Sequence, residues 1–465
     1  MKIIGTLLLL VCAAYAHAQT PSVLWQHKYG GTNTDQSNKV ITTRDGGYML
    51  AGITYSDDGD ISYINGPSDG WLVKTDSGGN LTWQSNYGGS LNEEITGICQ
   101  TKDSGYIFAG WTSSPELPLF HGGFNDVYVV KTDSIGNILW QKCYGGSGFD
   151  EATSIQLTSD GGYIIAGGTT SPDGDVTGYR PGATGFLYNV WILKLDDTGR
   201  IEWEKTYGGT NGDLANCIIQ LPDSGYIVAC VTGSTDSDVT YNHGLTDVWL
   251  LRLDDTGKLV WQKTYGGSEY DNVNAIIPTT GGYVFAGNTG SDDGDVTQNR
   301  GGGIYEGDMW VVKVDDTGKI VWQKTYGGSS ADEAIDIVKA NDSGYIFTGW
   351  TGSDDSEVTG YHDSTDCWVV RIDDTGAIVW STIVGGTELD EGTGLLQRAD
   401  NSIVVTGYSA SINYGVPYGF ALDDYWLFDM GTLPNSVPKQ PLQIMCSSTL
   451  PLLQVRSMPP LRNPS

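Results

Sequence analysis

Basic residues are scarce in this sequence, which has 25 Lys and Arg against 56 Asp and Glu and a formal net charge of -31 at pH 7. This negative charge excludes binding of nucleic acid through its phosphates, because such binding needs a basic face on the protein. The same charge disfavours docking on an anionic membrane surface. Long apolar runs are also missing: no segment of about 18 uninterrupted apolar residues occurs, so no transmembrane helix is expected. The abundant residues are instead Gly (65), Tyr (26) and Trp (15), and this aromatic content indicates a folded chain.

The first residues have the pattern of a secretory signal peptide. Lys2 is followed by an apolar stretch, residues 3–14, and then by Ala16-His17-Ala18, a small-x-small cleavage pattern. We predict a signal peptide over residues 1–18 and a secreted or cell-surface location. A buried N-terminal helix is the alternative. Acylation of Cys12 is disfavoured because Val11 precedes it.

Cysteine is infrequent and irregularly placed. Without Cys12, six remain: Cys99, Cys143, Cys217, Cys230, Cys367 and Cys446. An exported protein can form disulfides, but these cysteines do not recur at one position of the repeat described next. We therefore interpret them as small hydrophobic residues, with a disulfide framework as the alternative.

One unit is repeated seven times. The Trp of a segment resembling I-x-W-Q-K-x-Y-G-G recurs at Trp25, Trp83, Trp140, Trp203, Trp261, Trp322 and Trp380. Each copy predicts four strands; in the copy at 150–207 they cover 152–157, 163–167, 190–195 and 201–207. Asp-Gly turns separate them, with Asp capping turn amides and Gly in the left-handed conformation.

Seven four-stranded units predict an all-β fold, a seven-bladed β-propeller with antiparallel blades over residues 19–436. We name the strands of each blade A to D from the axis to the rim. The last copy lacks strand D, while the chain opens with an unpaired strand over 23–29, so we expect that strand to complete the seventh blade (1+3 closure). Residues 437–465 contain six Pro and no Gly or acid, and we predict a disordered or aberrant tail.

The repeat resembles the bacterial secreted β-propeller repeat often called SBBP, and related arrays in exported proteins of the type IX secretion kind. The resemblance rests on Tyr144-Gly145-Gly146-Ser147 with Asp150, and on 160–164 with Ala166-Gly167. It implies a surface or secreted propeller without an assigned activity, and some members are associated with glycan degradation. The Gly- and β-rich sorting domain usual at the end of type IX cargo is not evident here.

Every copy has a carboxylate at the start of strand A. These acids are Asp35, Glu93, Asp150, Asp213, Asp271, Asp332 and Asp390. Seven acids at one channel mouth could hold a cation. The alternative is that each caps the amides of its own Tyr-Gly-Gly turn.

Five of the loops between strands B and C are acidic. Candidate calcium ligands are Asp57, Asp58, Asp60, Asp173, Asp175, Asp292, Asp293 and Asp295; similar acids occur at 236–238 and 354–357. Carboxylates around a Gly turn suit Ca²⁺, although none of these loops has the full EF-hand pattern. Solvated turn acids are the alternative.

Six B–C loops also share a side chain that carries nitrogen. These residues are Asn65, His121, Arg180, His243, Arg300 and His362, with Phe120, Tyr179 and Tyr361 directly before three of them. Such a ring could bind a carboxylated or hydroxyl-rich ligand, with aromatic side chains stacking on sugar faces. Pairing of these side chains with acids of neighbouring blades is the alternative.

No nucleophile elbow, zinc-protease motif or P-loop is present, so no catalytic residue is predicted. We expect an exported, monomeric binding module for a glycan or protein on the B–C loop face, with calcium stiffening those loops. A glycan-active hydrolase or lyase with carboxylates in the channel mouth is one alternative. A purely structural surface protein is the other.

Overall fold

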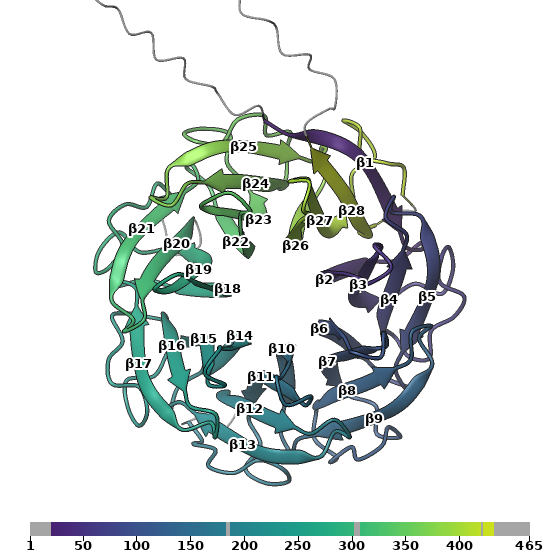
Figure 1. Cartoon of the computed structure of the whole chain (residues 1–465), viewed down its shortest axis with the longest axis vertical. Coiled ribbons are helices and arrows are strands. Elements are labelled where there is room, and N and C mark those ends of the chain that lie inside the picture. Colours follow the sequence, from purple (N-terminus) through teal and green to yellow (C-terminus); the bar gives the residue numbers. More distant parts are fainter. Residues whose placement is uncertain (1–19, 183–186, 302–306, 420–421, 432–465) are drawn as a thin grey trace, which may run out of the picture. The chain divides into compact units, whose positions relative to one another are not determined.

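The computed structural model describes residues 20–182, 187–301, 307–419 and 422–431. Over these ranges the chain forms 28 strands and no helix, arranged as seven four-stranded antiparallel sheets around a central channel (Figure 1). The predicted seven-bladed β-propeller is confirmed. The predicted signal peptide, the tail at 437–465 and Cys446 lie outside the described residues.

Each blade runs from strand A at the channel to strand D at the rim, as the sheet order shows. Blade 1 comprises β2 (Asp35–Thr42), β3 (Tyr48–Thr54), β4 (Asp69–Thr75) and β5 (Leu81–Tyr87). Blade 2 comprises β6 (Glu93–Gln100), β7 (Tyr106–Thr112), β8 (Asp126–Thr132) and β9 (Ile138–Tyr144). Blade 3 comprises β10 (Asp150–Leu157), β11 (Tyr163–Thr169), β12 (Asn189–Leu195) and β13 (Ile201–Tyr207).

The remaining blades follow the same order. Blade 4 comprises β14 (Asp213–Gln220), β15 (Tyr226–Thr232), β16 (Asp247–Leu253) and β17 (Leu259–Tyr265). Blade 5 comprises β18 (Asp271–Thr279), β19 (Gly282–Thr289), β20 (Asp308–Asp315) and β21 (Ile320–Tyr326). Blade 6 comprises β22 (Asp332–Lys339), β23 (Tyr345–Thr351), β24 (Asp366–Ile372) and β25 (Ile378–Val384).

Blade 7 combines both ends of the described chain. It contains β26 (Asp390–Gln397), β27 (Ile403–Ser409) and β28 (Asp424–Gly431), and β1 (Ser22–Tyr29) pairs with β28 as its strand D. In Figure 1 the purple β1 lies beside the yellow-green β28. The predicted 1+3 closure is therefore present.

The middle strands are buried because each blade packs its two faces against its neighbours. All seven residues of β3 and of β11 are buried, and both strands are almost entirely apolar or small. Such continuous apolar runs are typical of strands covered on both faces. Strand D at the rim is instead half-exposed, as in β13.

The C–D turns form as predicted. In blade 3, Asp196 Oδ1 accepts the backbone N–H groups of Thr198 and Arg200, both at 2.9 Å. Gly199 takes φ +73°, a conformation that strains residues with a Cβ. This turn therefore requires both the Asp and the Gly.

Strand A carries a β-bulge at its fourth residue in every blade, for example at Thr153 between Ala152 and Ser154. A bulge redirects a side chain, and here it directs the side chain to the next blade: Thr153 Oγ1 donates to the carbonyl of Ala215 at 2.7 Å. Asn38, Thr96, Asn216, Asn274 and Thr393 make the same inter-blade bond. In blade 6 this position is Ile335, which has no such donor.

The five described cysteines, Cys99, Cys143, Cys217, Cys230 and Cys367, are all free. Three of them are buried. Cys143, Cys230 and Cys367 belong to hydrophobic clusters between blades. Within the described ranges the cysteines therefore pack as small apolar residues, as expected.

Candidate functional site

The carboxylates at the start of strand A are buried, and each caps the turn that precedes it. Asp150 accepts hydrogen bonds from the backbone N–H of Gly146 and from the hydroxyls of Thr169 and Ser171. The glycine N–H bond recurs at Asp35, Glu93, Asp213, Asp271, Asp332 and Asp390. These contacts correspond to turn capping, the predicted alternative to a cation site.

Burial raises the pKa values of these acids. The pKa values of Asp35, Asp271 and Asp332 rise to about 6 because the carboxylates lose solvent, although hydrogen bonds from hydroxyl and N–H groups oppose the shift. The ring of acids therefore binds protons more tightly in the folded chain than in the unfolded chain.

The acidic B–C loops are bonded to the turns that precede strand A. Asp58 accepts the N–H of Thr32 at 2.7 Å and its hydroxyl at 3.0 Å, while Asp60 accepts the N–H of Gly30 at 3.2 Å. The same pattern holds for Asp173, Asp175, Asp293 and Asp295. Asp57 and Asp292 are exposed at the loop tips. Across the part of the chain that the structure describes, no group of three or more His, Cys, Asp or Glu is arranged to hold a metal ion.

Three of the six nitrogen-bearing side chains pair with an acid of the next blade. His121 Nδ1 lies 3.0 Å from Asp126 of its own blade, and Nε2 lies 3.4 Å from Asp175 of the next. Arg180 pairs with Asp238 at 2.9 Å, and Arg300 pairs with Glu357 at 2.9 Å, again across a junction. Asn65, His243 and His362 contact the first residue of strand C in their own blades.

The three aromatic residues before this series contact protein groups. Phe120 and Tyr179 pack against buried inter-blade clusters. The Tyr179 hydroxyl donates to the carbonyl of Leu187 at 3.0 Å, and the Tyr361 hydroxyl donates to the carbonyl of Ser364. In this conformation all three aromatic residues support the loops.

A second set of repeated acceptors, five carboxylates and one amide, was missed from the sequence. The first residue of strand C accepts the backbone N–H of the nitrogen-bearing residue in six blades: Asp69, Asp126, Asn189, Asp247, Asp308 and Asp366. The signal was present, because this residue stands two positions before a Trp or Tyr in every copy.

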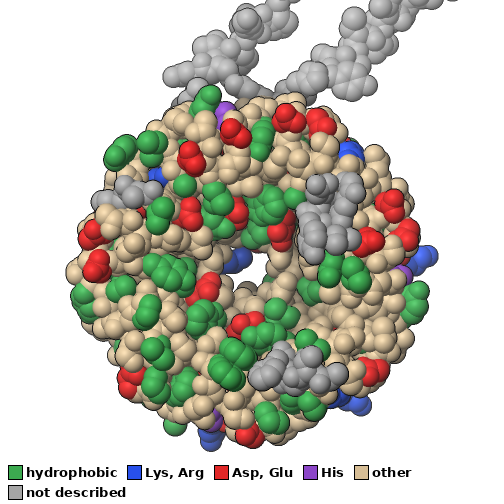
Figure 2. Space-filling model, turned by 180° about the vertical axis from the view of Figure 1, so that it is seen from behind, with side chains coloured by type: hydrophobic (Ala, Val, Ile, Leu, Met, Phe, Trp, Pro, Cys, Tyr) green, Lys and Arg blue, Asp and Glu red, His purple; other side chains and the backbone are tan. Residues whose placement is uncertain are grey.

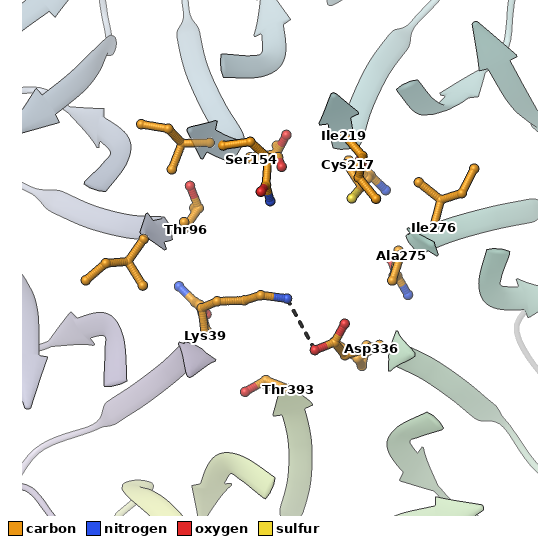
Figure 3. Close-up of a pocket in the computed structure, with 18 of the residues that line it drawn as sticks. Lys39, Thr96, Ser154, Cys217, Ile219, Ala275, Ile276, Asp336 and Thr393 are labelled. Carbon is orange, nitrogen blue, oxygen red and sulfur yellow. Dashed lines mark hydrogen bonds and ion pairs between the residues drawn. The ribbon is translucent and has the colours of Figure 1, made fainter. Parts of the chain in front are cut away.

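The central channel holds charged residues that sequence reasoning did not select. A cavity of about 400 Å³ is lined by strand A of the blades, and Lys39 reaches across it to Asp336 (Figure 3). The two charged groups lie 3.2 Å apart, and Asp336 also accepts the backbone N–H of Leu395 at 3.1 Å. Burial lowers the pKa of Lys39, but attraction to Asp336 outweighs that effect, so the net pKa is raised.

These charges stand at one register position, directly after the bulge of strand A. The other blades have small residues there: Gly97, Ser154, Cys217, Ala275 and Gly394. Aligning the seven copies at this position is the signal that would have revealed the pair.

Glutamates at the second position of strand A contact polar and aromatic side chains. Trp111 Nε1 donates to Glu94 at 3.2 Å, and the Tyr408 hydroxyl donates to Glu391. Glu333 accepts Asn274 Nδ2 at 2.8 Å and borders, with Trp350, a further cavity of about 270 Å³. These pairs differ from blade to blade.

The face formed by the D–A and B–C loops exposes large apolar side chains. Among the described residues these are Tyr55, Tyr63, Leu91, Leu119, Phe124, Tyr241, Leu245, Tyr270, Ile412, Tyr414, Tyr418 and Leu422. Figure 2 shows hydrophobic side chains spread over this face around an opening at the axis. The opposite face, made of short A–B and C–D turns, exposes Ile135 in the described ranges.

No protein-family model matches the chain. The chain is 25% identical over 420 residues to the regulatory protein FlaEY of Caulobacter vibrioides, covering 82% of this chain and 43% of that protein. It is 24% identical over 115 residues to an uncharacterized WD repeat-containing protein, L264, of Acanthamoeba polyphaga mimivirus, covering 22% of this chain and 8% of that protein. The chain thus spans less than half the length of these relatives.

Solved propellers are similar at low identity. The WD40 domain of Neurospora crassa Pan2 gives a TM-score of 0.49 at 10% identity, covering 90% of this chain and 97% of that chain. The WD40 β-propeller domain of Doa1 gives 0.48 at 11% identity, covering 90% and 98%. The described part of the chain contains no helix that could cross a lipid bilayer.

Proposed function

We propose that this chain is an exported binding module whose loop face binds a protein or glycan partner. The observation that carries the proposal is the contrast between the faces: the loop face presents twelve large apolar side chains among the described residues, whereas the turn face presents Ile135 in its turns and Leu81 and Ile138 at the adjoining strand ends. Apolar patches on one face of a soluble domain mark interaction sites. The resemblance to secreted SBBP-like repeats and the leader-like residues 1–18 support export.

The patch is densest on the B–C loop of blade 7. Tyr418 is 83% exposed and Ile412 59% exposed, and both lie where the acidic pattern of the other loops is absent. Aromatic residues of this kind dominate binding energy at interfaces. We therefore expect blade 7 to make the central contact.

The test is a pair of double variants with matched exposure. A partner captured with the purified chain and identified should bind the Ile412→Ser/Tyr418→Ser variant at least ten-fold more weakly, measured by surface plasmon resonance. Val260→Ser/Val321→Ser on the rim, at 60% and 57% exposure, is the control. Equal weakening by both pairs would contradict the proposal.

Glycan cleavage is a second candidate function, favoured by Glu391. Burial raises its pKa to about 7, and the nearby Glu333 carboxylate raises it too, against the hydrogen bond from Tyr408. A carboxyl group with a pKa near the working pH can act as a general acid. Hydrolysis of nitrophenyl glycosides by the wild type, lost in Glu391→Gln, would support this function, and inactivity of the wild type would exclude it for these substrates.

Calcium binding by the B–C loops belongs to the same proposal. A ligand that binds only the folded state raises the midpoint of thermal unfolding. A rise in millimolar Ca²⁺, reversed by chelator and absent in Asp57→Asn/Asp292→Asn, supports the metal sites. An unchanged midpoint contradicts them.

A further inference from the structure

Two positions of strand A, the strand nearest the axis, depart from the repeat. At the position directly after the bulge, blade 1 has Lys39 and blade 6 has Asp336, whereas the other five blades have small residues. The small residues leave the cavity of about 400 Å³ open. The second position of the strand also varies, with Glu in blades 2, 3, 6 and 7 but Gln36, Leu214 and Asn272 elsewhere. A residue that every blade repeats serves the shared geometry. Lys39 and Asp336 hold one junction together, as their contacts show, but the shared geometry of the blades does not require a charge at this position.

The narrow part of the channel offers both donors and acceptors to a ligand. Asp336 is occupied by Lys39 and by the Leu395 N–H, so it anchors the ammonium group. Lys39 has this one carboxylate partner, and its side chain is 39% exposed toward the channel, which leaves N–H groups to donate. Asn216 and Asn274 line the same cavity and use their amide nitrogens on backbone carbonyls, so their amide oxygens remain as acceptors.

Aromatic rings lie one step along the blades from this cavity. The Trp111 indole N–H and the Tyr408 hydroxyl are bonded to glutamates at the second position of strand A. Tyr270 and Trp350 border the cavity of about 270 Å³ at the junction of blades 5 and 6. Asn274 of the larger cavity donates its amide N–H to Glu333 of the smaller one at 2.8 Å, so the two cavities are neighbours.

Charge selects among the ligands that fit these two cavities. The chain carries a net charge of -31, and four blades have a glutamate at the second position of strand A, so anions are repelled on approach. Inside, Lys39 and Asp336 neutralise one another. Aromatic surfaces together with hydroxyl, amide and ammonium groups complement a ring with apolar faces and many hydroxyl groups. The favoured ligand is therefore neutral and hydroxyl-rich.

We propose that the axial channel binds a neutral sugar residue, the end of a glycan chain, with Lys39 and the strand A amides in the larger cavity and Trp350 in the neighbouring one. Figure 3 shows the side chains that surround this space, with Lys39 extending above Thr393 toward Asp336. This inference rests on the proposed binding function and adds to it a specific site and ligand class. It does not depend on the exposed loop-face residues.

The test is calorimetric titration of the purified protein with a panel of neutral sugars: glucose, galactose, mannose, N-acetylglucosamine and their disaccharides, with digalacturonate as the charged comparison. At least one neutral sugar should bind with 1:1 stoichiometry. Ala275→Leu, which fills the cavity and leaves the ion pair intact, should weaken binding at least ten-fold, as should Trp350→Ala. Thermal unfolding of each variant checks that the fold is retained.

Tyr418→Ala on the loop face separates this inference from the proposed function. Unchanged sugar binding in Tyr418→Ala, with loss in the two channel variants, supports the axial site. Sugar binding lost in Tyr418→Ala but kept in Ala275→Leu overturns the axial site and leaves the loop-face function standing. Binding of none of the neutral sugars, or tighter binding of digalacturonate, overturns the inference.

Discussion

Six of the seven junctions between blades are built alike, and the junction between blades 6 and 7 differs. At each of the six, a Tyr at the end of strand D donates its hydroxyl to a Gly carbonyl in the C–D turn of the next blade, as Tyr326 does to Gly376 at 2.7 Å. Blade 6 has Val384 at this position. Blade 7 takes its strand D from the N-terminal β1, so it has no C–D turn to accept such a bond. A repeated side chain is thus kept only where its partner exists.

The same junction also lacks the inter-blade bond at the axis. Ile335 stands where the other six blades have Thr or Asn. Asp336 replaces that bond by accepting the N–H of Leu395 in blade 7 and pairing with Lys39 of blade 1. One carboxylate therefore links blades 6, 7 and 1, and the closure of the ring depends on contacts that the repeat does not supply.

The largest expected effect is that of pH on the free energy of unfolding, and it should involve the strand A carboxyls of all seven blades. The strand A carboxyls ionise near pH 4 in the unfolded chain, whereas Asp35, Asp271 and Asp332 hold their protons to about pH 6 in the folded chain. The folded state binds more protons in this window, so stability falls as pH rises through it. We expect the free energy of unfolding in urea to be at least about 3 kcal/mol higher at pH 5 than at pH 7.5.

Asp271→Asn is the control for this pH dependence, because an amide does not titrate, so this variant should lose the share of the pH dependence that Asp271 contributes. At the acid end the trend reverses. Hydrogen bonds from Thr198 and Arg200 lower the pKa of the turn residue Asp196 to about 2. Such turn aspartates lose their contribution to the free energy of unfolding as the pH falls toward that value. A free energy of unfolding that increases from pH 5 to pH 7.5 would contradict the assignment.

The second effect is confined to the junction between blades 6 and 7 and its link to blade 1. Asp336→Ala removes the acceptor of the Leu395 N–H and leaves Lys39 without its carboxylate. We expect a loss of about 2–3 kcal/mol in urea unfolding, because a buried donor and a charge both lose their partner. Ala at this position is tolerated in blade 5, where Ala275 stands. A loss below about 0.5 kcal/mol would mean that the contacts of Asp336 do not stabilise this junction.

A smaller effect should distinguish the two kinds of junction at the rim. Tyr326→Phe leaves the carbonyl of Gly376 without its donor, and we expect a loss of about 1 kcal/mol. Val384→Tyr restores the repeat in blade 6 but finds no turn in blade 7, so it should bring no gain. Both variants are compared by their urea midpoints. A gain from Val384→Tyr would show that blade 7 offers an unrecognised acceptor.

The smallest effect is a stabilisation in blade 6. In the other blades the aromatic residue of strand C bonds a Gln or Glu of strand D, as Trp310 does with Gln323 at 2.9 Å. Ser381 stands at this position in blade 6, and the buried Trp368 Nε1 has no partner among the described residues. Ser381→Gln should raise the free energy of unfolding by about 0.5–1 kcal/mol. Gln323→Ser, the reciprocal change, should lower it by a similar amount.

The fold was predictable from sequence because the repeat carries it. The recurring Trp fixed the length of each unit, the Asp-Gly turns separated the strands, and the unpaired strand 23–29 predicted the closure that β1 and β28 form. These are local signals with fixed spacing. They repeat seven times, so each copy checks the others.

The candidate site was less predictable, because repetition draws attention to the residues that build the fold. His121 and Arg180 occupy a repeated position in the B–C loops, and each contacts an acid of the adjacent blade. Lys39 and Asp336 each occur once at their register position, 297 residues apart in sequence. Their meeting depends on the curvature of the ring, which no local spacing reports. Departures from the repeat were the informative signal.

The pairing of β1 with β28 also sets the order in which the molecule can be completed. Trp426 Nε1 donates to Gln26 at 2.9 Å, a contact between residues 400 positions apart. Blades 1 to 6 each close within one continuous stretch of chain, whereas blade 7 cannot form until β28 has been synthesised. Contacts of such long range fold slowly. The growing chain must therefore keep β1 unpaired while blades 1 to 6 are made, and a chaperone that binds β1 would control when the ring closes.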